Sequence, residues 1–427
     1  MSNLAAPSVN IVGGGIAGLI ASVNLVRAGL RVSVFESAGG FGGRARTRHV
    51  DGFSLNQGPH AVYLAGAFHR ELVRLGIPFK GKVTKPHAPQ GLWKGRLHGL
   101  PQSAASLVTT SLLNPAEKFA YMGMLKGVLD GATGEGTFAH WLDTQELTPR
   151  LRAALKALAR VTSYAHAPDM VSAGAMLDQI RIGLKGVMYV DGGWASLVRG
   201  LMDAARADGA MLHAGARVER VLVEGRQSRV VLADGFEHVA DATILALGPG
   251  EAAAIAPAVA SLGREAGEAR AIRANCLDLA LSRWPKEGRQ FVLGIDQPYY
   301  LSLHSEAARL APEAGAVVHL ARYLGPGEIP EQDAISELET LADKAIPGWR
   351  ALEVKRQELR GMVVSNAVVR PDRARPGVEV ADAPGLFIAG DWVGEEGMIS
   401  DTSAASALKA AAAVQRWLEQ CTSRVAA

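Results

Sequence analysis

The chain has few residues of the kinds that build disulfide or metal scaffolds. Its 427 residues include two cysteines, Cys276 and Cys421, which lie too far apart in sequence to suggest a disulfide framework. The 11 histidines are scattered and form no HxH or HExxH pattern, so no metal site is expected. The composition therefore gives no support to a disulfide-rich or metal-dependent class of protein.

Long apolar runs and runs of one charge are also missing. No stretch of about 18 apolar residues occurs, which excludes a membrane span and leaves peripheral membrane contact open. The 45 basic and 42 acidic residues give a net charge of +3, and no Lys/Arg run predicts binding to nucleic acid. The N-terminus lacks the basic region of a signal peptide and leads directly into an apolar strand, so we expect a cytoplasmic protein.

A glycine-rich nucleotide motif lies near the start of the chain. Residues 9–36 have the pattern of a strand, a turn, an apolar helix and a second strand. The turn and the first turn of the helix contain Gly13, Gly15, Ile16, Ala17 and Gly18. Such a turn lets a pyrophosphate approach the helix N-terminus, and Glu36 at the end of the second strand can accept both hydroxyl hydrogens of a ribose. The motif predicts a dinucleotide site that disfavours NADP, because Glu36 would repel a 2′-phosphate.

The residues after Glu36 indicate which dinucleotide is bound. Gly42-Gly43-Arg44 with Thr47 resembles the GGR-x-x-T signature of FAD enzymes in the superfamily of amine oxidases, protoporphyrinogen oxidases and phytoene desaturases. A guanidinium suits this role because its fork matches paired phosphate oxygens. Residues 51–60 resemble the strand and turn that lie against the flavin ring in this superfamily. The resemblance implies FAD contacts from Gly42, Gly43, Arg44, Gly58, Pro59 and His60.

Later segments extend the resemblance along the chain. Residues 189–193 resemble the return into the FAD domain, and Val218 matches the residue whose backbone holds the adenine. Residues 385–414 resemble the carboxy-terminal FAD motif, in which a strand ends and a helix N-terminus points toward the flavin. The residues of this motif expected to contact FAD are Gly390, Asp391, Met398 and Ile399. A simple helix-entry role is the alternative for Asp391.

Because these motifs lie at both ends and in the middle of the chain, the cofactor domain must be interrupted. We expect an α/β fold in which a Rossmann-type FAD-binding domain (GR2-like) is interleaved with an α+β substrate domain. The FAD-binding domain is expected to comprise residues 1–75, 189–256 and 355–427. The substrate domain is expected to comprise residues 76–188, which are strongly helical, and residues 257–354, which contain most of the strand-like runs.

The resemblance implies an FAD-dependent dehydrogenase or desaturase that removes hydride from a mainly apolar organic molecule at flavin N5. No cysteine lies between residues 277 and 420, so FAD is expected to be bound non-covalently. Two absences distinguish the chain from amine oxidases. Residues 274–279 contain no lysine, Lys286 being the nearest, and residues 395–399 contain no aromatic residue for an amine cage. The sequence AGDW at 389–392 resembles the phytoene dehydrogenase-like branch.

Two other functions stay open at this point: an amine oxidase that releases H2O2, and a binding protein similar to Rab GDP-dissociation inhibitors. For an enzyme, His60 and Tyr299 are the candidate catalytic residues, His60 as a proton acceptor near neutral pH. A structural histidine in a turn and a tyrosine in the core are the alternatives. The sequence does not determine the substrate's identity, the oligomeric state, or the electron acceptor, for which oxygen and a quinone are the candidates.

Overall fold

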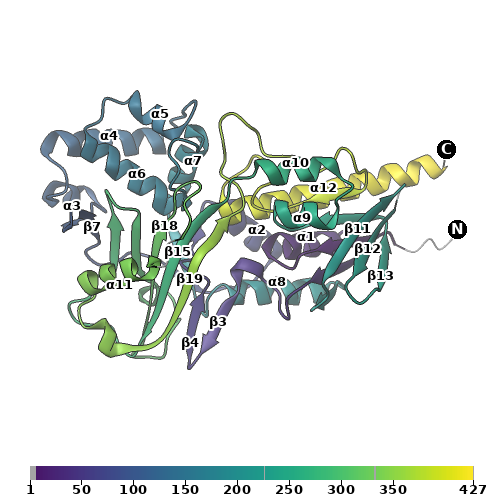
Figure 1. The fold of residues 1–427 in the computed structure, drawn as a ribbon, viewed down its shortest axis with the longest axis horizontal. Helices are drawn as coiled ribbons and strands as arrows, with labels where there is room; N and C mark the ends of the chain where they lie inside the picture. The colour runs from purple at the N-terminus through teal and green to yellow at the C-terminus, as the bar shows by residue number, and fades with distance from the viewer. Residues whose placement is uncertain (1–5, 226, 331–332, 427) are drawn as a thin grey trace.

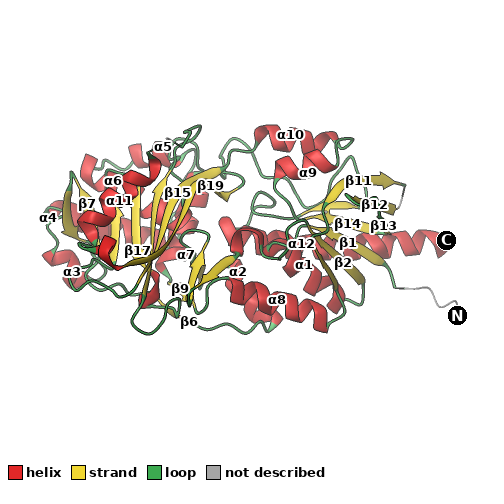
Figure 2. Ribbon diagram, turned by 60° about the horizontal axis from the view of Figure 1, so that its bottom comes forward, coloured by secondary structure: helices red, strands yellow, loops and turns green. Residues whose placement is uncertain are grey.

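The computed structural model describes residues 6–225, 227–330 and 333–426. Two regions lie side by side along the longest axis of the molecule (Figure 1 and Figure 2). One is built on a parallel sheet and the other on a larger, mainly antiparallel sheet. The helices α2 and α7 lie near the junction of the two regions in Figure 2.

Within the described residues, the first region has a five-stranded parallel sheet in the order β10-β2-β1-β14-β20. Its strands are β1 (Ser8–Val12), β2 (Arg31–Glu36), β10 (Met211–Ala214), β14 (Ala242–Leu245) and β20 (Leu386–Ile388). Ile11, Val34 and Ile244 are fully buried. A parallel sheet covered on both faces requires such continuous apolar strands.

Both faces of this sheet are covered. One face shares a core with α1 (Ile16–Arg27), α2 (Ala67–Leu75), α8 (Ala195–Ala207) and α12 (Ile399–Ala426). The other shares a core with the strands β11 (Val218–Glu224) and β12 (Gln227–Leu232) and with α9 (Pro249–Ile255) and α10 (Ala260–Glu268). The strand β13 (Glu237–Ala240) pairs antiparallel with β12. The order β1-α1-β2 places the N-terminus of α1 at the carboxyl edge of the sheet, where open α/β sheets bind ligands.

The part of the chain that the structure describes also forms a seven-stranded sheet in the order β19-β15-β18-β17-β16-β7-β8. Its strands are β7 (Gln90–Trp93), β8 (Arg96–Gly99), β15 (Ile272–Leu281), β16 (Phe291–Gly294), β17 (Tyr299–Leu303), β18 (Ala316–Tyr323) and β19 (Glu353–Ser365). Pairing is antiparallel except between β16 and β7. Two segments far apart in sequence therefore build one sheet.

Helices and short elements complete this region and the junction. A helical group contains α3 (Ala104–Thr109), α4 (Pro115–Leu129), α5 (Phe138–Asp143), α6 (Pro149–Ser163) and α7 (Ala173–Leu184). The short strands are β3 (Thr47–Val50), β4 (Phe53–Asn56), β5 (Val62–Tyr63), β6 (Gly81–Val83) and β9 (Val187–Val190), and the 3-10 turns are Gly43–Ala45, His304–Glu306 and Trp349–Leu352. Leu151 and Ala154 of α6 pack with Leu293 of β16, which fixes the helical group against the sheet.

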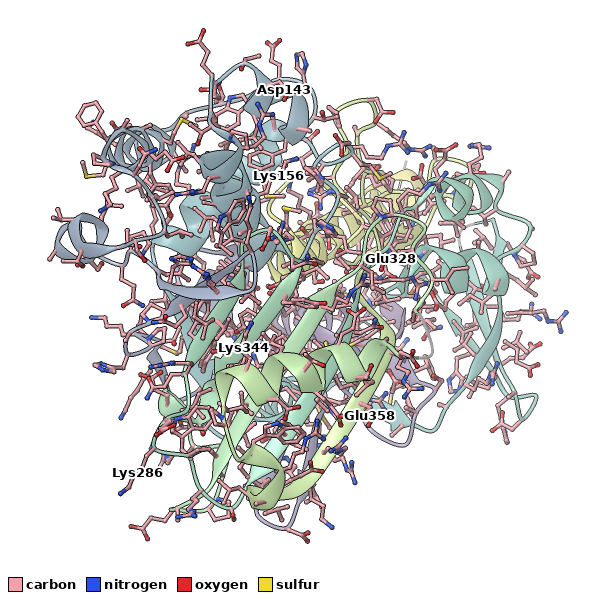
Figure 3. All side chains as sticks on the ribbon, turned by 60° about the vertical axis from the view of Figure 1, so that its left-hand side comes forward. Asp143, Lys156, Lys286, Glu328, Lys344 and Glu358 are labelled. Atoms are coloured by element: carbon pink, nitrogen blue, oxygen red, sulfur yellow. The ribbon has the colours of Figure 1, made fainter. Side chains whose placement is uncertain are left out.

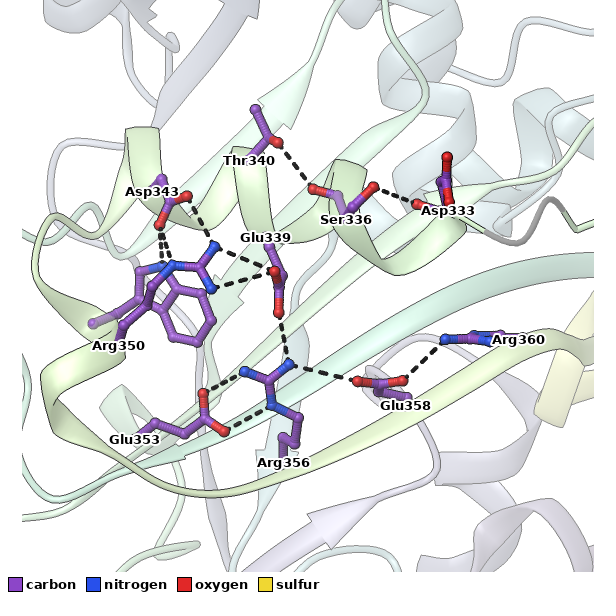
Figure 4. Close-up of polar contacts among 11 residues, drawn as sticks. Asp333, Ser336, Glu339, Thr340, Asp343, Arg350, Glu353, Arg356, Glu358 and Arg360 are labelled. Atoms are coloured by element: carbon purple, nitrogen blue, oxygen red, sulfur yellow. Dashed lines mark hydrogen bonds and ion pairs between the residues drawn. The ribbon is translucent and has the colours of Figure 1, made fainter.

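The opposite face of the large sheet carries α11 (Ala334–Ala345), whose Leu338 and Leu341 pack with Leu279 and Leu320. A charged network ties this helix to β19 (Figure 4): Glu339 accepts from both Arg350 and Arg356, and Arg356 is also paired with Glu353. Such a network fixes the packing of α11 more than it adds stability, because these ion pairs are partly exposed.

The predicted α/β fold with a Rossmann-type domain is confirmed. The expected strand-helix-strand unit at residues 9–36 appears as β1, α1 and β2. The boundary predicted at residue 355 falls inside β19, which pairs with β15 of the large sheet over its length. The division into domains stays a prediction. Within the described residues, no helix combines the length and the apolar character that crossing a membrane requires.

Candidate active site

The glycines of the first loop leave room where a phosphate would approach. Gly13 has a φ of 105°, and a Cβ there would collide with the carbonyl oxygen of Ala246. A Cβ on Gly18 would collide with the carbonyl oxygen of Gly13, so this glycine allows α1 to pack closely. A Cβ on Gly15 would meet nothing within 4 Å. Gly15 therefore faces open space beside the N-terminus of α1, as an anion site requires.

The second glycine block lies directly on the first. The N–H of Gly42 donates to the carbonyl oxygen of Gly14 at 2.8 Å, and Gly15 and Gly42 form an isolated parallel bridge. Gly42 and Gly43 both have positive φ, at 114° and 53°. Positive φ is readily adopted by glycine, which explains why the chain returns to the loop with this residue pair.

Glu36 is held at the end of β2 by backbone donors. Its Oε2 accepts from the N–H of Gly14 at 2.9 Å and its Oε1 from the N–H of Ala38 at 2.8 Å. Oε1 also accepts a longer bond of 3.4 Å from the hydroxyl of Ser37, and a carboxylate oxygen such as Oε2 has two lone pairs. The carboxylate is therefore fixed where it can accept hydrogen bonds from a ribose.

Arg44 and Asp391, 347 positions apart, form an ion pair with a separation of 2.7 Å. Asp391 is buried and also accepts from the backbone N–H and the Nδ2 of Asn366, at 3.0 and 2.8 Å. Burial alone would raise the pKa of Asp391, but Arg44 and Asn366 together lower it. The carboxylate is thus kept charged, and one guanidinium nitrogen of Arg44 also donates to the carbonyl of Val364.

These groups surround one cavity of about 480 Å³. The predicted residues that line it are Gly13, Gly15, Ile16, Ala17, Glu36, Gly42, Gly43, Arg44, Pro59, His60, Gly390, Asp391 and Ile399. Open space at Gly15, a fixed carboxylate and a guanidinium at the glycine block match the donors and acceptors of FAD. The individual contacts of these residues with FAD stay predictions.

Ile399 begins α12 at the wall of this cavity. It has a φ of 57°, which is uncommon for a β-branched residue. Strained backbone of this kind occurs at ligand sites. Ser400 and Ser403 in the first turns of α12 line the same cavity, although the sequence analysis did not single them out.

The remaining predicted cofactor residues support the cavity from outside it. Gly58 has a φ of 75°, and a Cβ there would lie 2.9 Å from Sγ of Cys276. Met398 is buried in a core cluster. Val218 pairs with Leu232 in the antiparallel sheet and does not line the cavity, so its contact with adenine stays a prediction.

His60 lies in the cavity wall between the two regions. Its Nδ1 is 3.0 Å from the carbonyl oxygen of Gly58, and its ring packs edge-on against Trp194 with 4.7 Å between centroids. Burial lowers the pKa of His60 to about 4, against a weaker opposing effect of the Gly58 carbonyl. The imidazole is therefore neutral at neutral pH. Trp194, which also lines the cavity, was missed because no sequence motif marks it.

The structure places Tyr299 away from both cavities, and its catalytic role stays a prediction that this location does not support. Its hydroxyl donates to Glu337 of α11 at 3.0 Å, and it lines neither large cavity. Successive side chains of a strand point to opposite faces, so its neighbour Tyr300 points the other way and lines the second cavity. The sequence could not show which of the two adjacent tyrosines faces the site.

The second cavity, of about 320 Å³, adjoins the first. Ala61, Tyr63 and Tyr164 line both cavities, and the hydroxyl of Tyr164 donates to the carbonyl of Pro59 at 2.8 Å. Its other walls come from the helical group and the large sheet, for example Leu113, Leu158, Val161, Phe291, Leu293 and Tyr300. Not one Asp, Glu, Lys, Arg or His is among the described residues that line it.

A buried polar chain lies beneath the junction of the cavities. The hydroxyl of Tyr300 is 3.2 Å from Nε2 of His304 and 3.2 Å from the hydroxyl of Tyr189. The ring of His304 lies 4.4 Å from that of His319, whose Nδ1 is 2.6 Å from Asp278. Asp278 also accepts from the N–H of Gly58. The chain thus links the turn at Gly58 to the second cavity, and its scattered members carry no recognisable spacing in sequence.

No lysine is found in the walls of either cavity among the described residues. Lys286, the nearest alternative in sequence, is exposed and points away from the molecule (Figure 3). Trp392 of the AGDW sequence donates from Nε1 to the carbonyl of Leu247 and is buried in the core. Trp392 therefore supports the sheet and lines neither cavity.

The family of the chain follows from comparison with known proteins. The sequence profile of the family described as flavin containing amine oxidoreductase matches residues 16–276, which is more than half of the chain. The chain belongs to this family. The superfamily of flavin enzymes predicted from the glycine motifs is thereby confirmed.

Individual relatives are distant. The chain is 24% identical over 272 residues to a 4,4′-diapolycopen-4-al dehydrogenase of Metabacillus indicus, over 56% of this chain and 55% of that protein. The chain thus spans about half the length of the curated relatives it matches. An oxidoreductase of Methanosarcina mazei has a similar solved structure, with a TM-score of 0.75 and 19% identity over 94% of this chain and 99% of that one. The solved structure of a cyclohexylamine oxidase of Brevibacterium oxydans is also similar. Its TM-score is 0.71, and it is 17% identical over 97% of this chain and 100% of that one. These structures share the fold.

Proposed function

We propose that the protein is a dehydrogenase or desaturase that oxidises an uncharged, mainly apolar organic molecule. One observation carries this proposal: the cavity that adjoins the predicted flavin site has no carboxylate, lysine, arginine or histidine in its described walls. Bound FAD supplies the oxidant, since its N5 accepts a hydride. The similarity to the dehydrogenase of Metabacillus indicus, whose name denotes an apolar polyene aldehyde, agrees with an uncharged substrate.

The physical argument rests on the cost of burying a charge. An amine is protonated at neutral pH, and moving an unpaired ammonium group into an apolar cavity costs several kcal/mol. A carboxylate would compensate for this cost, whereas the faces of aromatic rings contribute only about 0.5–2 kcal/mol. Aromatic rings such as those of Tyr63, Tyr164 and Phe291 line the cavity, but no carboxylate is among its described lining residues. The cavity therefore favours an uncharged molecule over an amine.

The residues of the junction have separate tasks in this proposal. Tyr164 closes the turn at Pro59 and separates the polar cavity from the apolar one. The apolar walls exclude water and orient the substrate by shape, which raises the rate by fixing the reacting carbon. His60, neutral at neutral pH, packs beside Trp194 and is proposed to border the flavin ring without carrying charge.

Anaerobic bleaching of the flavin tests the proposal. The purified holoprotein is mixed with paired compounds of similar carbon skeleton: uncharged polyenes and cyclic alkenes on one side, primary and secondary amines on the other. We expect bleaching by members of the uncharged set and none by the amines. Bleaching by amines alone, with activity that rises along the amine's own titration and stoichiometric peroxide in air, would establish an amine oxidase instead.

Family membership argues against the non-enzymatic binding protein considered from the sequence. Such a protein has no need of a complete cofactor site, whereas Glu36, Arg44 and Asp391 all line one cavity here. The colour of the purified protein, which reports bound flavin, decides this point without any knowledge of the substrate. A colourless preparation that does not take up FAD would overturn the enzyme proposal as a whole.

A further inference from the structure

Five of the seven tyrosines of the chain line the apolar cavity, and four of their hydroxyls already have partners within the protein. The hydroxyls of Tyr63 and Tyr164 donate to backbone carbonyls. Those of Tyr189 and Tyr300 lie 3.2 Å apart and contact each other. The hydrogen bonds of these four side chains stay inside the wall of the cavity and hold it together.

Tyr121 of α4 is the fifth tyrosine of this wall. Within the part of the chain that the structure describes, its hydroxyl has no hydrogen-bond partner. Burial raises the pKa of Tyr121 to about 12, and no hydrogen bond or neighbouring charge contributes to that change. The hydroxyl is therefore protonated at neutral pH and has a hydrogen free to donate.

The hydroxyl of Tyr121 reaches open space inside the protein. A hydroxyl on the outer surface would keep its ordinary pKa, whereas burial changes this one. Among the described residues, the polar side-chain atoms that are both sealed from solvent and without a partner include the hydroxyl of Tyr323 but not that of Tyr121. The open space that Tyr121 lines is the apolar cavity. Its hydroxyl is therefore accessible to a molecule held in that cavity.

The other polar side chains of the described cavity wall are already engaged or wet. Thr162 donates to backbone carbonyls of its own helix, and Thr84 contacts Glu306 at 3.5 Å. Gln102 is exposed to solvent and donates to a backbone carbonyl. A hydroxyl that is withdrawn from water and left unpaired costs free energy, so the one on Tyr121 is expected to have a partner when the cavity is filled.

We propose that Tyr121 binds an uncharged oxygen of the substrate: its hydroxyl donates a hydrogen bond to a carbonyl, hydroxyl or ether oxygen on an otherwise apolar molecule. The inference rests on the proposed function and narrows its substrate class. A hydrogen-bonding group in an apolar wall discriminates strongly against an analogue that lacks the matching atom, because the group is then left unpaired.

The contact orients the substrate and takes no part in hydride transfer. Tyr121 is in the wall of the apolar cavity and not among the described residues of the cavity of the glycine loops. Its helix α4 lies toward the end of the molecule away from the parallel sheet in both views (Figure 1 and Figure 2). An oxygen bound at Tyr121 therefore holds the part of the molecule that is away from the predicted flavin site.

Equilibrium dialysis of the holoprotein with terpenes of one carbon skeleton tests the contact. Geraniol carries a hydroxyl, geranyl methyl ether carries an oxygen that accepts but cannot donate, and myrcene carries no oxygen. We expect Tyr121→Phe to weaken binding of both oxygenated compounds about three- to tenfold, as the loss of one hydrogen bond predicts. Binding of myrcene should stay unchanged or become tighter. Each compound is compared between variant and unchanged protein, so differences in solubility cancel.

Tyr323→Phe is the matched control. The hydroxyl of Tyr323 is also without a partner among the described residues, but Tyr323 lines neither cavity. The same substitution there should leave the binding of all three compounds unchanged. Retained flavin and an unchanged melting temperature show that both variants are folded.

The outcomes are separable. Equal binding of geraniol by Tyr121→Phe and the unchanged protein overturns the contact, and so does an equal loss for myrcene, a loss confined to geraniol, or no binding of any of the three compounds. Bleaching of the flavin by uncharged compounds together with such a result leaves the proposed function standing. Binding that depends on Tyr121 as expected, with no bleaching by any uncharged compound, supports the contact and refutes the proposed function.

Discussion

The two adjoining cavities differ in how they are built. The cavity of the glycine loops is lined by glycines and by charged residues such as Glu36, Arg44 and Asp391. The apolar cavity has no charged residue in its described walls, which come from short segments spread between residues 61 and 300. The first must match a cofactor of fixed chemistry with directed hydrogen bonds, while the second selects by shape and by the exclusion of charge.

This difference separates cofactor binding from substrate choice. Directed contacts restrict residue type at each position, so they leave motifs in the sequence. Apolar walls restrict only volume and polarity, and many residues satisfy both. Substitutions in the polar cavity should therefore change cofactor retention, stability and pH dependence, whereas substitutions in the apolar cavity should change turnover and substrate range.

The largest effect is expected for Arg44→Ala. The substitution removes a predicted pyrophosphate contact and leaves the buried Asp391 without its cation. Breaking a fully buried pair costs about 3–5 kcal/mol, and the loss here should be smaller because the Arg44 side chain is 39% exposed. Because Asp391 has a lowered pKa in the folded protein, the lost stability is present above its unfolded pKa and disappears as pH falls through the folded value. Urea unfolding and FAD titration measure both effects.

Arg48→Ala, on the exposed strand β3, is the control for this change. It should leave the free energy of unfolding within about 0.5 kcal/mol of the unchanged protein. If Arg44→Ala behaved in the same way, with FAD fully retained, the polar cavity would be wrongly assigned.

The carboxyl group of Asp401, in the first turn of α12, should make the free energy of unfolding depend on pH. Burial raises its pKa to about 6, against the opposing effects of the Phe68 N–H and Arg70. The folded protein therefore binds a proton more tightly than the unfolded chain, so the free energy of unfolding falls as pH rises from about 4 to about 6. The rise from 3.8 to about 6 corresponds to about 3 kcal/mol. Asp401→Asn should lack this decline.

The measurement is urea unfolding of both proteins between pH 4 and pH 8. The difference in stability between Asp401→Asn and the unchanged protein should shift in favour of the variant across the window and then stay constant. A difference that is independent of pH would show that the Asp401 carboxyl titrates normally.

Glu36→Ala should weaken FAD binding about ten- to a hundredfold. The carboxylate is held by two backbone N–H groups, and a hydrogen bond to a charged group contributes roughly 1.5–3 kcal/mol. Glu251→Ala, which removes another acid of the same cavity, should change the affinity only slightly. Equilibrium dialysis of FAD compares the two, and equal effects would refute a specific role for Glu36.

The smallest effects are expected for substitutions that test which residues line the apolar cavity. Tyr300→Phe removes a hydroxyl that lines it and contacts His304, and turnover should fall by less than ~100-fold, below the range of a dedicated acid or base. Tyr299→Phe should leave turnover unchanged, because that hydroxyl bonds to Glu337. His60→Ala should also stay below ~100-fold. A larger loss with Tyr299→Phe would reverse the assignment of the two tyrosines.

Much of the polar cavity was predictable from local sequence. Thirteen of the predicted cofactor residues line it, because the turn, the helix start and the strand end are each specified by consecutive residues. The residues missed there, such as Trp194, Asn366 and Ser400, reach the cavity through packing between distant segments. The direct pairing of Arg44 with Asp391 also has no local signal, although each residue was expected at the cofactor.

The sequence by itself determined the cofactor class. Glycine spacing and the position of an acidic residue restrict the backbone and the charge at a dinucleotide site, and both restrictions act over short stretches of chain. Only the tertiary structure decided what faces the substrate. The strand alternation that sends Tyr300 to the cavity and Tyr299 to α11, and the assembly of uncharged walls from separate segments, depend on register and packing that no short stretch specifies.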